Sequence, residues 1–202
     1  MPKRVSSQGG DKRNRILRAA IAVFSRKGFF NSKVSEIARA SGVADGTIYL
    51  YFKNKDDLLI SLFEEKMSEV VADVIQRTAS GGGALEKLKI FIDNHMDLLE
   101  REAGLIEVLQ VEIRQSSKFL KDYAPVKFFD YLDVLSGILE EGKRDGVFRQ
   151  DLNVGVARRV VFGAMDELSR TYILSKKQKF HPSITAGEIF RMLSEGLCAQ
   201  RA

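Results

Sequence analysis

The stretch that decides the fold reads S-K-V-S-E-I-A-R-A-S-G-V-A-D-G-T-I-Y-L-Y-F-K-N-K and covers residues 32–55. Its first part predicts a short helix over Lys33–Ala40, N-capped by Ser32, with apolar residues at helical spacing. Gly42 then supplies a tight turn, because glycine tolerates a positive φ. A second helix is predicted from about Asp45, and Asn54 is predicted to cap a third. Two short helices joined by such a turn are typical of a helix-turn-helix.

The second helix of a helix-turn-helix lies in the major groove of DNA, where residues near its N-terminus reach the base edges. Thr47 and Tyr49 suit such base contacts. Tyr51, Lys53 and Lys55 suit phosphate contacts, because they lie at the end of the element and at the start of the next helix. The stretch therefore predicts a DNA-binding module.

The distribution of charge favours the same function. The chain of 202 residues carries a formal net charge of +5. Residues 1–57 hold 12 Lys and Arg against 5 Asp and Glu, whereas the remaining residues hold 20 against 22. A basic module on a near-neutral body is the electrostatic pattern expected of a DNA-binding protein. Without the helix-turn-helix pattern, a solvated charged face would be the simpler interpretation.

Two motifs in this region resemble the DNA-binding signature of the TetR family of bacterial repressors: G-V-A-D-G-T-I-Y-L-Y-F-K-N-K-D-D-L (residues 42–58) and I-L-R-A-A-I-A-V-F-S-R-K-G-F (residues 16–29). One departure is Ala44, where many members carry a serine or threonine cap. We expect Asp45 to compensate through the helix dipole. The expected DNA-binding residues are Lys33, Ser35, Ala44, Asp45, Gly46, Thr47, Tyr49, Tyr51, Lys53 and Lys55.

The rest of the chain predicts helices only. A first helix is expected from about Asp11 to Gly28, followed by two core residues, Phe29 and Phe30. Further helices are expected over residues 56–78, 84–101, 105–115, 126–143, 153–174 and 183–200. We therefore predict an all-α protein of about nine helices. Its parts are a mobile basic arm (1–10), a helix-turn-helix DNA-binding domain (11–55) and a helical ligand-binding and dimerisation domain (56–202), whose residues 56–78 form a connecting helix.

Composition limits the remaining function classes. No apolar run is long enough to span a bilayer and no secretory signal is visible, so we expect a cytoplasmic protein. A single cysteine, Cys198, excludes an internal disulfide framework. The body shows no Gly-rich phosphate loop, no Cys/His metal spacing and no histidine near a nucleophile. We expect neither an enzyme, nor a metal site, nor a bound cofactor.

Asp166 is unusual because it lies in an apolar run, V-V-F-G-A-M-D-E-L (residues 160–168). A buried carboxylate must be paired or hydrogen-bonded. Asp166 is therefore either a structural polar contact of the core or a polar anchor in a ligand pocket, and both readings stay open. The Phe and Met residues of the body are ambiguous in the same way, since aromatic stripes are typical of a plain core as well as of an apolar pocket.

Three segments of the body resemble the FadR-type TetR regulators of fatty-acid degradation: E-I-R-Q-S (112–116), L-S-G-I-L-E-E-G-K-R-D-G (135–146) and V-F-G-A-M-D-E (161–167). The resemblance implies a repressor that a long-chain acyl-CoA releases from DNA. It also implies a cation for the CoA phosphates, for which Arg114 is expected, with an intrahelical pair to Glu107 or Gln110 as the alternative. The expected ligand-binding residues are Phe91, Leu109, Arg114, Phe128, Tyr131, Leu135, Phe162 and Asp166.

The last two predicted helices are more apolar than one small bundle requires, and Gly163 and Ala164 allow close helix approach. TetR-like proteins pair these helices about a two-fold axis, which matches a palindromic operator, so we expect a homodimer. Two alternatives remain. In the first, the body binds a cationic or aromatic drug, which requires two or more buried acidic groups at the pocket. In the second, it is an enzyme acting on a CoA thioester, although no base–nucleophile pair is visible.

Overall fold

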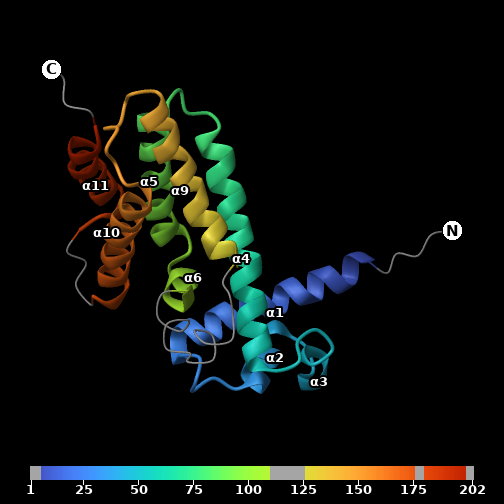
Figure 1. Ribbon diagram of the computed structural model, residues 1–202. Helices are drawn as coiled ribbons and strands as arrows, with labels where there is room; N and C mark the ends of the chain where they lie inside the picture. Colours follow the sequence, from blue (N-terminus) through green and yellow to red (C-terminus); the bar gives the residue numbers. More distant parts are fainter. Residues whose placement is uncertain (1–5, 110–125, 176–179, 199–202) are drawn as a thin grey trace. The chain divides into compact units, whose positions relative to one another are not determined.

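The computed structural model describes residues 6–109, 126–175 and 180–198, and within these ranges it contains nine helices and no β-strand (Figure 1). The predicted all-α class is thus confirmed. The helices are α1 (Ser6–Lys27), α2 (Val34–Ser41), α3 (Asp45–Ile48), α4 (Lys55–Thr78), α5 (Ala84–Arg101), α6 (Ala103–Glu107), α9 (Val126–Arg144), α10 (Val154–Leu174) and α11 (Pro182–Leu197). None of the helices in the described ranges is long and apolar enough to cross a bilayer.

The chain divides into two compact units, which are described separately. The N-terminal unit contains residues 6–65 together with 107–109, and the body contains residues 66–106, 126–175 and 180–198. Helix α4 is one continuous helix whose first part belongs to the N-terminal unit and whose second part belongs to the body.

Helix α1 packs against α2 and supplies much of the core of the N-terminal unit. It begins at Ser6, so its predicted start at Asp11 was wrong, and residues 6–10 are helical rather than part of an arm. It ends as predicted at Gly28, whose φ of 78° is open to glycine at low cost. Of the two phenylalanines that follow, Phe29 is buried as predicted. Phe30 is 62% exposed, so its assignment to the core was wrong.

The turn between α2 and α3 has the predicted glycine geometry. Gly42 has a φ of 68°, its amide donates to the Arg39 carbonyl, and the Val43 amide donates to the Ala38 carbonyl. These two bonds form a Schellman C-cap, which turns the chain sharply into α3. The predicted N-cap of α2 was wrong, because the Ser32 hydroxyl donates to the Gly28 and Val23 carbonyls instead.

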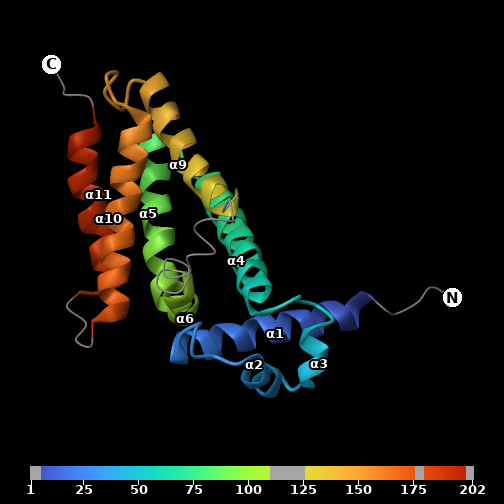
Figure 2. The same ribbon diagram turned by 60° about the horizontal axis from the view of Figure 1, so that its bottom comes forward.

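In the body, α5 packs against α9, α10 and α11 and therefore lies at the centre (Figures 1 and 2). Its observed bounds equal the predicted ones. Helix α10 begins as predicted, because the side chain of Asn153 accepts a hydrogen bond from the Val156 amide at 3.1 Å. Figure 2 shows α10 and α11 side by side along one flank.

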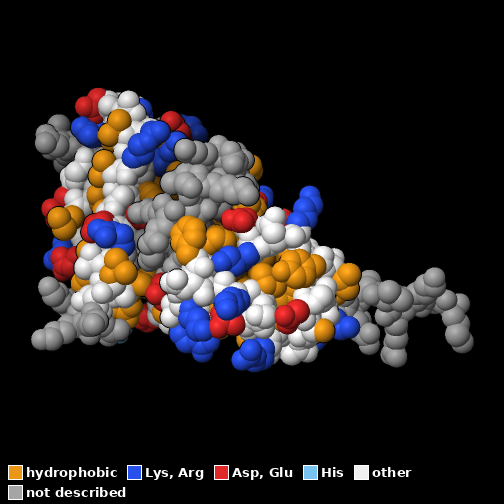
Figure 3. Space-filling model, turned by 90° about the horizontal axis from the view of Figure 1, so that it is seen from below, with side chains coloured by type: hydrophobic (Ala, Val, Ile, Leu, Met, Phe, Trp, Pro, Cys, Tyr) orange, Lys and Arg blue, Asp and Glu red, His pale blue; other side chains and the backbone are white. Residues whose placement is uncertain are grey.

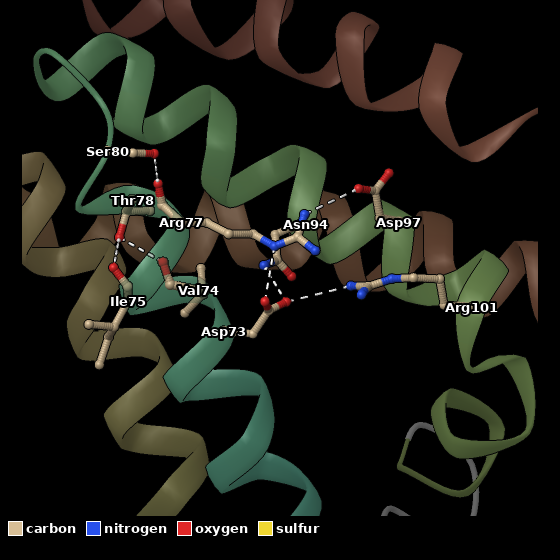
Figure 4. Close-up of polar contacts among 9 residues, drawn as sticks. All are labelled: Asp73, Val74, Ile75, Arg77, Thr78, Ser80, Asn94, Asp97 and Arg101. Atoms are coloured by element: carbon tan, nitrogen blue, oxygen red, sulfur yellow. Dashed lines mark hydrogen bonds and ion pairs between the residues drawn. The ribbon is translucent and has the colours of Figure 1, made fainter.

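A polar network joins the end of α4 to α5 (Figure 4). Asp73 accepts hydrogen bonds from Arg77 at 3.0 Å and from Asn94 at 3.0 Å, and Arg101 lies 3.6 Å away. Desolvation raises the pKa of Asp73, but the hydrogen bonds from Arg77 and Asn94 outweigh it, so the pKa lies below its usual value. Arg77 also pairs with Asp97 at 3.7 Å. The network fixes this half of α4 to the central helix of the body.

Candidate nucleic-acid interface and candidate ligand-binding core

The recognition surface is built by α3 and the turn that follows it. Helix α3 packs against α2, and only Ile48 of its four residues is buried. The helical hydrogen-bond pattern extends beyond Ile48, because the Leu50 and Tyr51 amides donate to the Thr47 and Ile48 carbonyls. Ile48 therefore anchors the element while the adjacent side chains project outward, which is the geometry that base contacts require.

Most of the residues predicted to bind DNA are accessible. Thr47 and Tyr51 are partly exposed, and Tyr49 is 56% exposed. Figure 3 shows one face of the N-terminal unit, on which Lys and Arg side chains, with some Asp and Glu among them, lie beside a patch of hydrophobic ones. The remaining exposed members of the predicted set are Lys33, Ala44, Asp45, Gly46 and Lys53, and Ser35 is partly exposed.

Lys55 differs from the other predicted residues. Its ammonium donates to the carbonyls of Phe29 at 2.7 Å, Ser32 at 2.9 Å and Phe30 at 3.4 Å. The same nitrogen lies 4.5 Å from the centroid of the Phe29 ring. Lys55 is thus bound to the loop between α1 and α2, and Lys53 is the exposed lysine of the pair.

Sequence reasoning missed one prominent residue of this surface. Leu50 is 81% exposed directly after α3, between Tyr49 and Tyr51. An apolar side chain placed in the major groove contacts thymine methyl groups. The signal was available, because Leu50 interrupts the helical apolar pattern on the side opposite Ile48.

An aromatic cluster of buried and half-buried rings in the body joins α5, α9 and α10. The Phe91 and Tyr131 rings lie 4.8 Å apart between centroids, and the Phe128 and Phe162 rings lie 5.1 Å apart. His95 lies 6.1 Å from both Tyr131 and Phe162. The structure thus brings together four of the predicted ligand residues around a histidine to which no role was assigned.

His95 connects the three helices through a directional chain of hydrogen bonds. The Ser169 hydroxyl donates to the Met165 carbonyl at 2.7 Å, so its oxygen accepts from His95 Nε2 at 3.3 Å. Nδ1 is then unprotonated and accepts from the Tyr131 hydroxyl at 2.9 Å. Desolvation lowers the pKa of His95 to about 4 against the opposing charge of Asp166. Burial also raises the pKa of Tyr131, so both groups are neutral at physiological pH.

The other predicted ligand residues fall into different environments. Leu135 is fully buried in the body. Asp166 is partly buried, and its charge acts on both His95 and Arg170. Leu109 is partly exposed and belongs to the N-terminal unit. Arg114 lies outside the described residues.

An open apolar groove of about 320 Å³ lies between the start of α10 and the end of α11. Val160 is 55% exposed in its wall, and Met192 is 74% exposed. Gly163 and Gly187 are exposed on the same two helices. The groove thus presents apolar side chains of the two helices for which the sequence predicts a subunit contact. No group of three His, Cys, Asp or Glu side chains arranged to hold a metal ion occurs in the described parts of the chain.

Comparison with known proteins covers both units. Residues 16–62 match the family "Bacterial regulatory proteins, tetR family", and residues 63–196 match "YsiA-like protein, C-terminal region", a TetR C-terminal family. The fatty acid metabolism regulator protein of Bacillus subtilis is 39% identical over 90% of this chain and 93% of its own length.

Two solved structures are similar along most of the chain. The fatty acid degradation regulator FadR of Bacillus halodurans has a TM-score of 0.85 and 38% identity, and covers 91% of this chain and 98% of its own. FadR of Bacillus subtilis in complex with stearoyl-CoA has a TM-score of 0.85 and 39% identity over the same shares. With its helix-turn-helix and its helical body, the chain belongs to the TetR family of bacterial regulatory proteins and is a DNA-binding transcriptional regulator.

Proposed function

We propose that this regulator represses genes of fatty-acid degradation and that a long-chain acyl-CoA releases it from its operator. The observation that carries the proposal is the similarity, along both units, to a regulator whose structure contains stearoyl-CoA. The regulator acts on bacterial DNA, so we place it in the cytoplasm, and it needs no catalytic cofactor.

The aromatic cluster supports an apolar ligand. Its polar atoms are paired with one another through the chain Tyr131–His95–Ser169, so the surrounding rings offer an apolar surface. Such an interior accepts a hydrocarbon chain without leaving a buried polar group unpaired. We assign the acyl chain to the surroundings of Phe91, Phe128, Tyr131, Leu135 and Phe162, and the CoA phosphates to Arg114, with Leu109 and Asp166 as further contacts.

We assign DNA recognition to residues 11–55. Thr47, Tyr49 and the exposed Leu50 face the bases, and Lys33 and Lys53 contact phosphates. Ser35, Tyr51 and residues 44–46 complete the contact surface. Residues 56–202 then form the ligand-binding and dimerisation domain, with α4 as the connecting helix.

We propose a homodimer formed through α10 and α11. The exposed side chains of Val156, Val160 and Met192 leave apolar surface on these helices, and burial of such surface drives association. Gly163 and Gly187 let the helices of two subunits approach closely. A two-fold dimer presents two recognition surfaces, which suits a palindromic operator.

Release from DNA requires that the ligand favour one conformation over another, since equal affinity for both shifts nothing. Helix α5 is suited to carry the change. Its Phe91 and His95 belong to the aromatic cluster, and its Asn94 is bonded to Asp73 of α4. A ligand that separates the rings therefore moves the helix to which α4 is attached.

The test is fluorescence anisotropy of the protein on its own upstream DNA at fixed salt, titrated with palmitoyl-CoA, free CoA and free palmitate. We expect release by the thioester alone. DNA binding that none of the three ligands changes would leave the DNA-binding function intact and discard the acyl-CoA effector. Palmitoyl-CoA hydrolysis followed in the same samples tests the enzyme alternative, and we expect none.

The drug-sensing alternative has little support in the body. It requires buried acidic groups, and no Asp or Glu side chain is fully buried among the residues that the structure describes. Binding of a cationic dye to the free protein, measured without DNA because such dyes also bind duplex DNA, distinguishes the two effectors: only a drug-responsive protein would bind it.

A further inference from the structure

We infer that Lys55 is a positioning residue of the helix-turn-helix, which fixes the loop between α1 and α2 by binding its backbone carbonyls and makes no phosphate contact. This inference rests on the DNA-binding function and is independent of the acyl-CoA effector. It replaces the phosphate contact expected from the sequence for this lysine.

The geometry of the ammonium carries the inference. Two short hydrogen bonds, to Phe29 O at 2.7 Å and Ser32 O at 2.9 Å, and a longer one to Phe30 O at 3.4 Å use the three N–H donors of one lysine. The Phe29 ring adds a cation–π contact at 4.5 Å. A phosphate contact would require the ammonium to give up these partners.

The carbonyls of the loop between α1 and α2 need a hydrogen-bond donor such as the Lys55 ammonium. The loop leads from the left-handed Gly28 to the start of α2, and its carbonyls lie outside regular helix. Ser32 uses its hydroxyl on the Gly28 and Val23 carbonyls, so it holds α1 while Lys55 holds the loop to α4. The recognition surface is thus positioned through contacts between α1, α2 and the first residue of α4.

Lys53 provides a matched control, because it lies two residues away and is exposed. A phosphate contact weakens binding to all DNA sequences equally when it is lost, and lowers the salt slope by about 0.9 per contact. A positioning residue affects the operator more than random DNA, because base contacts depend on orientation and phosphate attraction does not.

The decisive variants are Lys55→Arg and Lys55→Met, compared with Lys53→Met. Arginine keeps the charge, but its planar guanidinium cannot direct three N–H donors at the same three carbonyls. We expect both Lys55 variants to bind the operator about 10-fold more weakly, to bind random DNA within about twofold of the parent, and to keep the parent salt slope. We expect Lys53→Met to weaken both DNAs equally and to reduce the slope by about 0.9.

A Lys55→Arg variant that behaves as the parent, together with a reduced slope in Lys55→Met, would overturn the inference in favour of a phosphate contact. Unchanged operator binding by both variants would overturn it as well.

A second measurement uses the unmodified protein and so does not depend on folding of the variants. Lysines are acetylated with an amine-reactive ester, with and without operator DNA, and mapped by mass spectrometry. We expect Lys55 to label slowly both in free protein and in the DNA complex. We expect Lys53 to label rapidly in free protein and slowly when operator DNA is bound. Rapid labelling of Lys55 in free protein, suppressed by DNA, would contradict the inference. If the protein bound no DNA at all, Lys55 labelling in free protein would still test the carbonyl contacts.

Discussion

The side-chain amide of Asn94 donates to the carboxylate of Asp73 at 3.0 Å and joins the central helix of the body to the connecting helix. Asn94 is 3% exposed, whereas its neighbour His95 faces α9 and α10. One turn of α5 therefore contacts both the aromatic cluster and α4.

We predict that Asn94→Ala uncouples the ligand from DNA. Operator affinity and palmitoyl-CoA affinity should each stay within about threefold of the parent, since neither site is touched. The factor by which palmitoyl-CoA weakens DNA binding, commonly about 5- to 150-fold in allosteric proteins, should fall at least fivefold. Anisotropy titrations with and without ligand measure it. Asp97→Asn, which removes only an exposed ion pair to Arg77, is the control and should keep the parent factor.

The neutral His95 predicts a dependence of stability on pH. Because its pKa is lowered to about 4, the unfolded chain binds a proton in a range where the folded chain does not. The contribution of neutral His95 to the free energy of unfolding should therefore be fully present above about pH 6.5. It should be lost as the pH drops towards 4, which lowers the free energy of unfolding by up to about 3 kcal/mol. Urea unfolding across this range measures it. His95→Gln should flatten the dependence, whereas substitution of the exposed His181 should not.

Gly142 predicts a sharp steric effect. The ring of the fully buried Phe148 occupies the position that a Cβ at residue 142 would need. Gly142→Ala should destabilise the protein by about 1–3 kcal/mol, because overpacking forces the ring to move. Gly137 lies in the same helix with open space around it, so Gly137→Ala should be neutral or stabilising by up to about 1 kcal/mol. Thermal unfolding compares the two, and equal effects would contradict the packing explanation.

The recognition surface predicts two kinds of DNA-binding defect. Thr47→Ala and Tyr49→Ala should each cost about 1–3 kcal/mol on the operator and leave the salt slope unchanged. Lys33→Gln should weaken operator and random DNA alike and reduce the slope by about 0.9. Salt titrations on both DNAs separate the two kinds. A reduced slope for Tyr49→Ala would show that this side chain contacts the backbone instead.

We predict that the apolar face of α10 and α11 forms the contact between the two subunits of the dimer. Val160→Lys would bury an unpaired charge in the interface, so the dimer should dissociate at least about 100-fold more readily. Analytical ultracentrifugation measures the dissociation constant. Ile75→Lys replaces a similarly exposed apolar residue on α4 and should leave the dimer intact. Dissociation by both variants would point to a general loss of structure.

What the sequence could predict is mostly local. Gly28, Gly42 and Asn153 have the predicted turn and cap geometry, because a positive φ or a capping hydrogen bond depends on a few neighbouring residues. Asn54 also caps its helix, through the Asp57 amide at 2.8 Å. The family followed from the same short stretch.

What the sequence could not predict depends on contacts between distant segments. Lys55 meets the carbonyl of Phe29, which is 26 residues away, so its side chain looked available for DNA. The chain through His95 needs Tyr131 and Ser169 from two other helices, and no local pattern marks it. The redirected hydroxyl of Ser32 and the exposed ring of Phe30 depend on the same tertiary context.

Helix α4 carries Lys55 in its first turn and Asp73 near its end, without interruption. At a rise of 1.5 Å per residue, these two anchoring points lie about 27 Å apart along a stiff rod. A tilt of about 10° at the Asp73 end displaces the Lys55 end by about 5 Å, which is a substantial fraction of the roughly 34 Å between successive half-sites on DNA. Under the proposed mechanism, α4 would act as a lever arm, and a small rearrangement in the body would move the two recognition surfaces of the proposed dimer out of register with the half-sites.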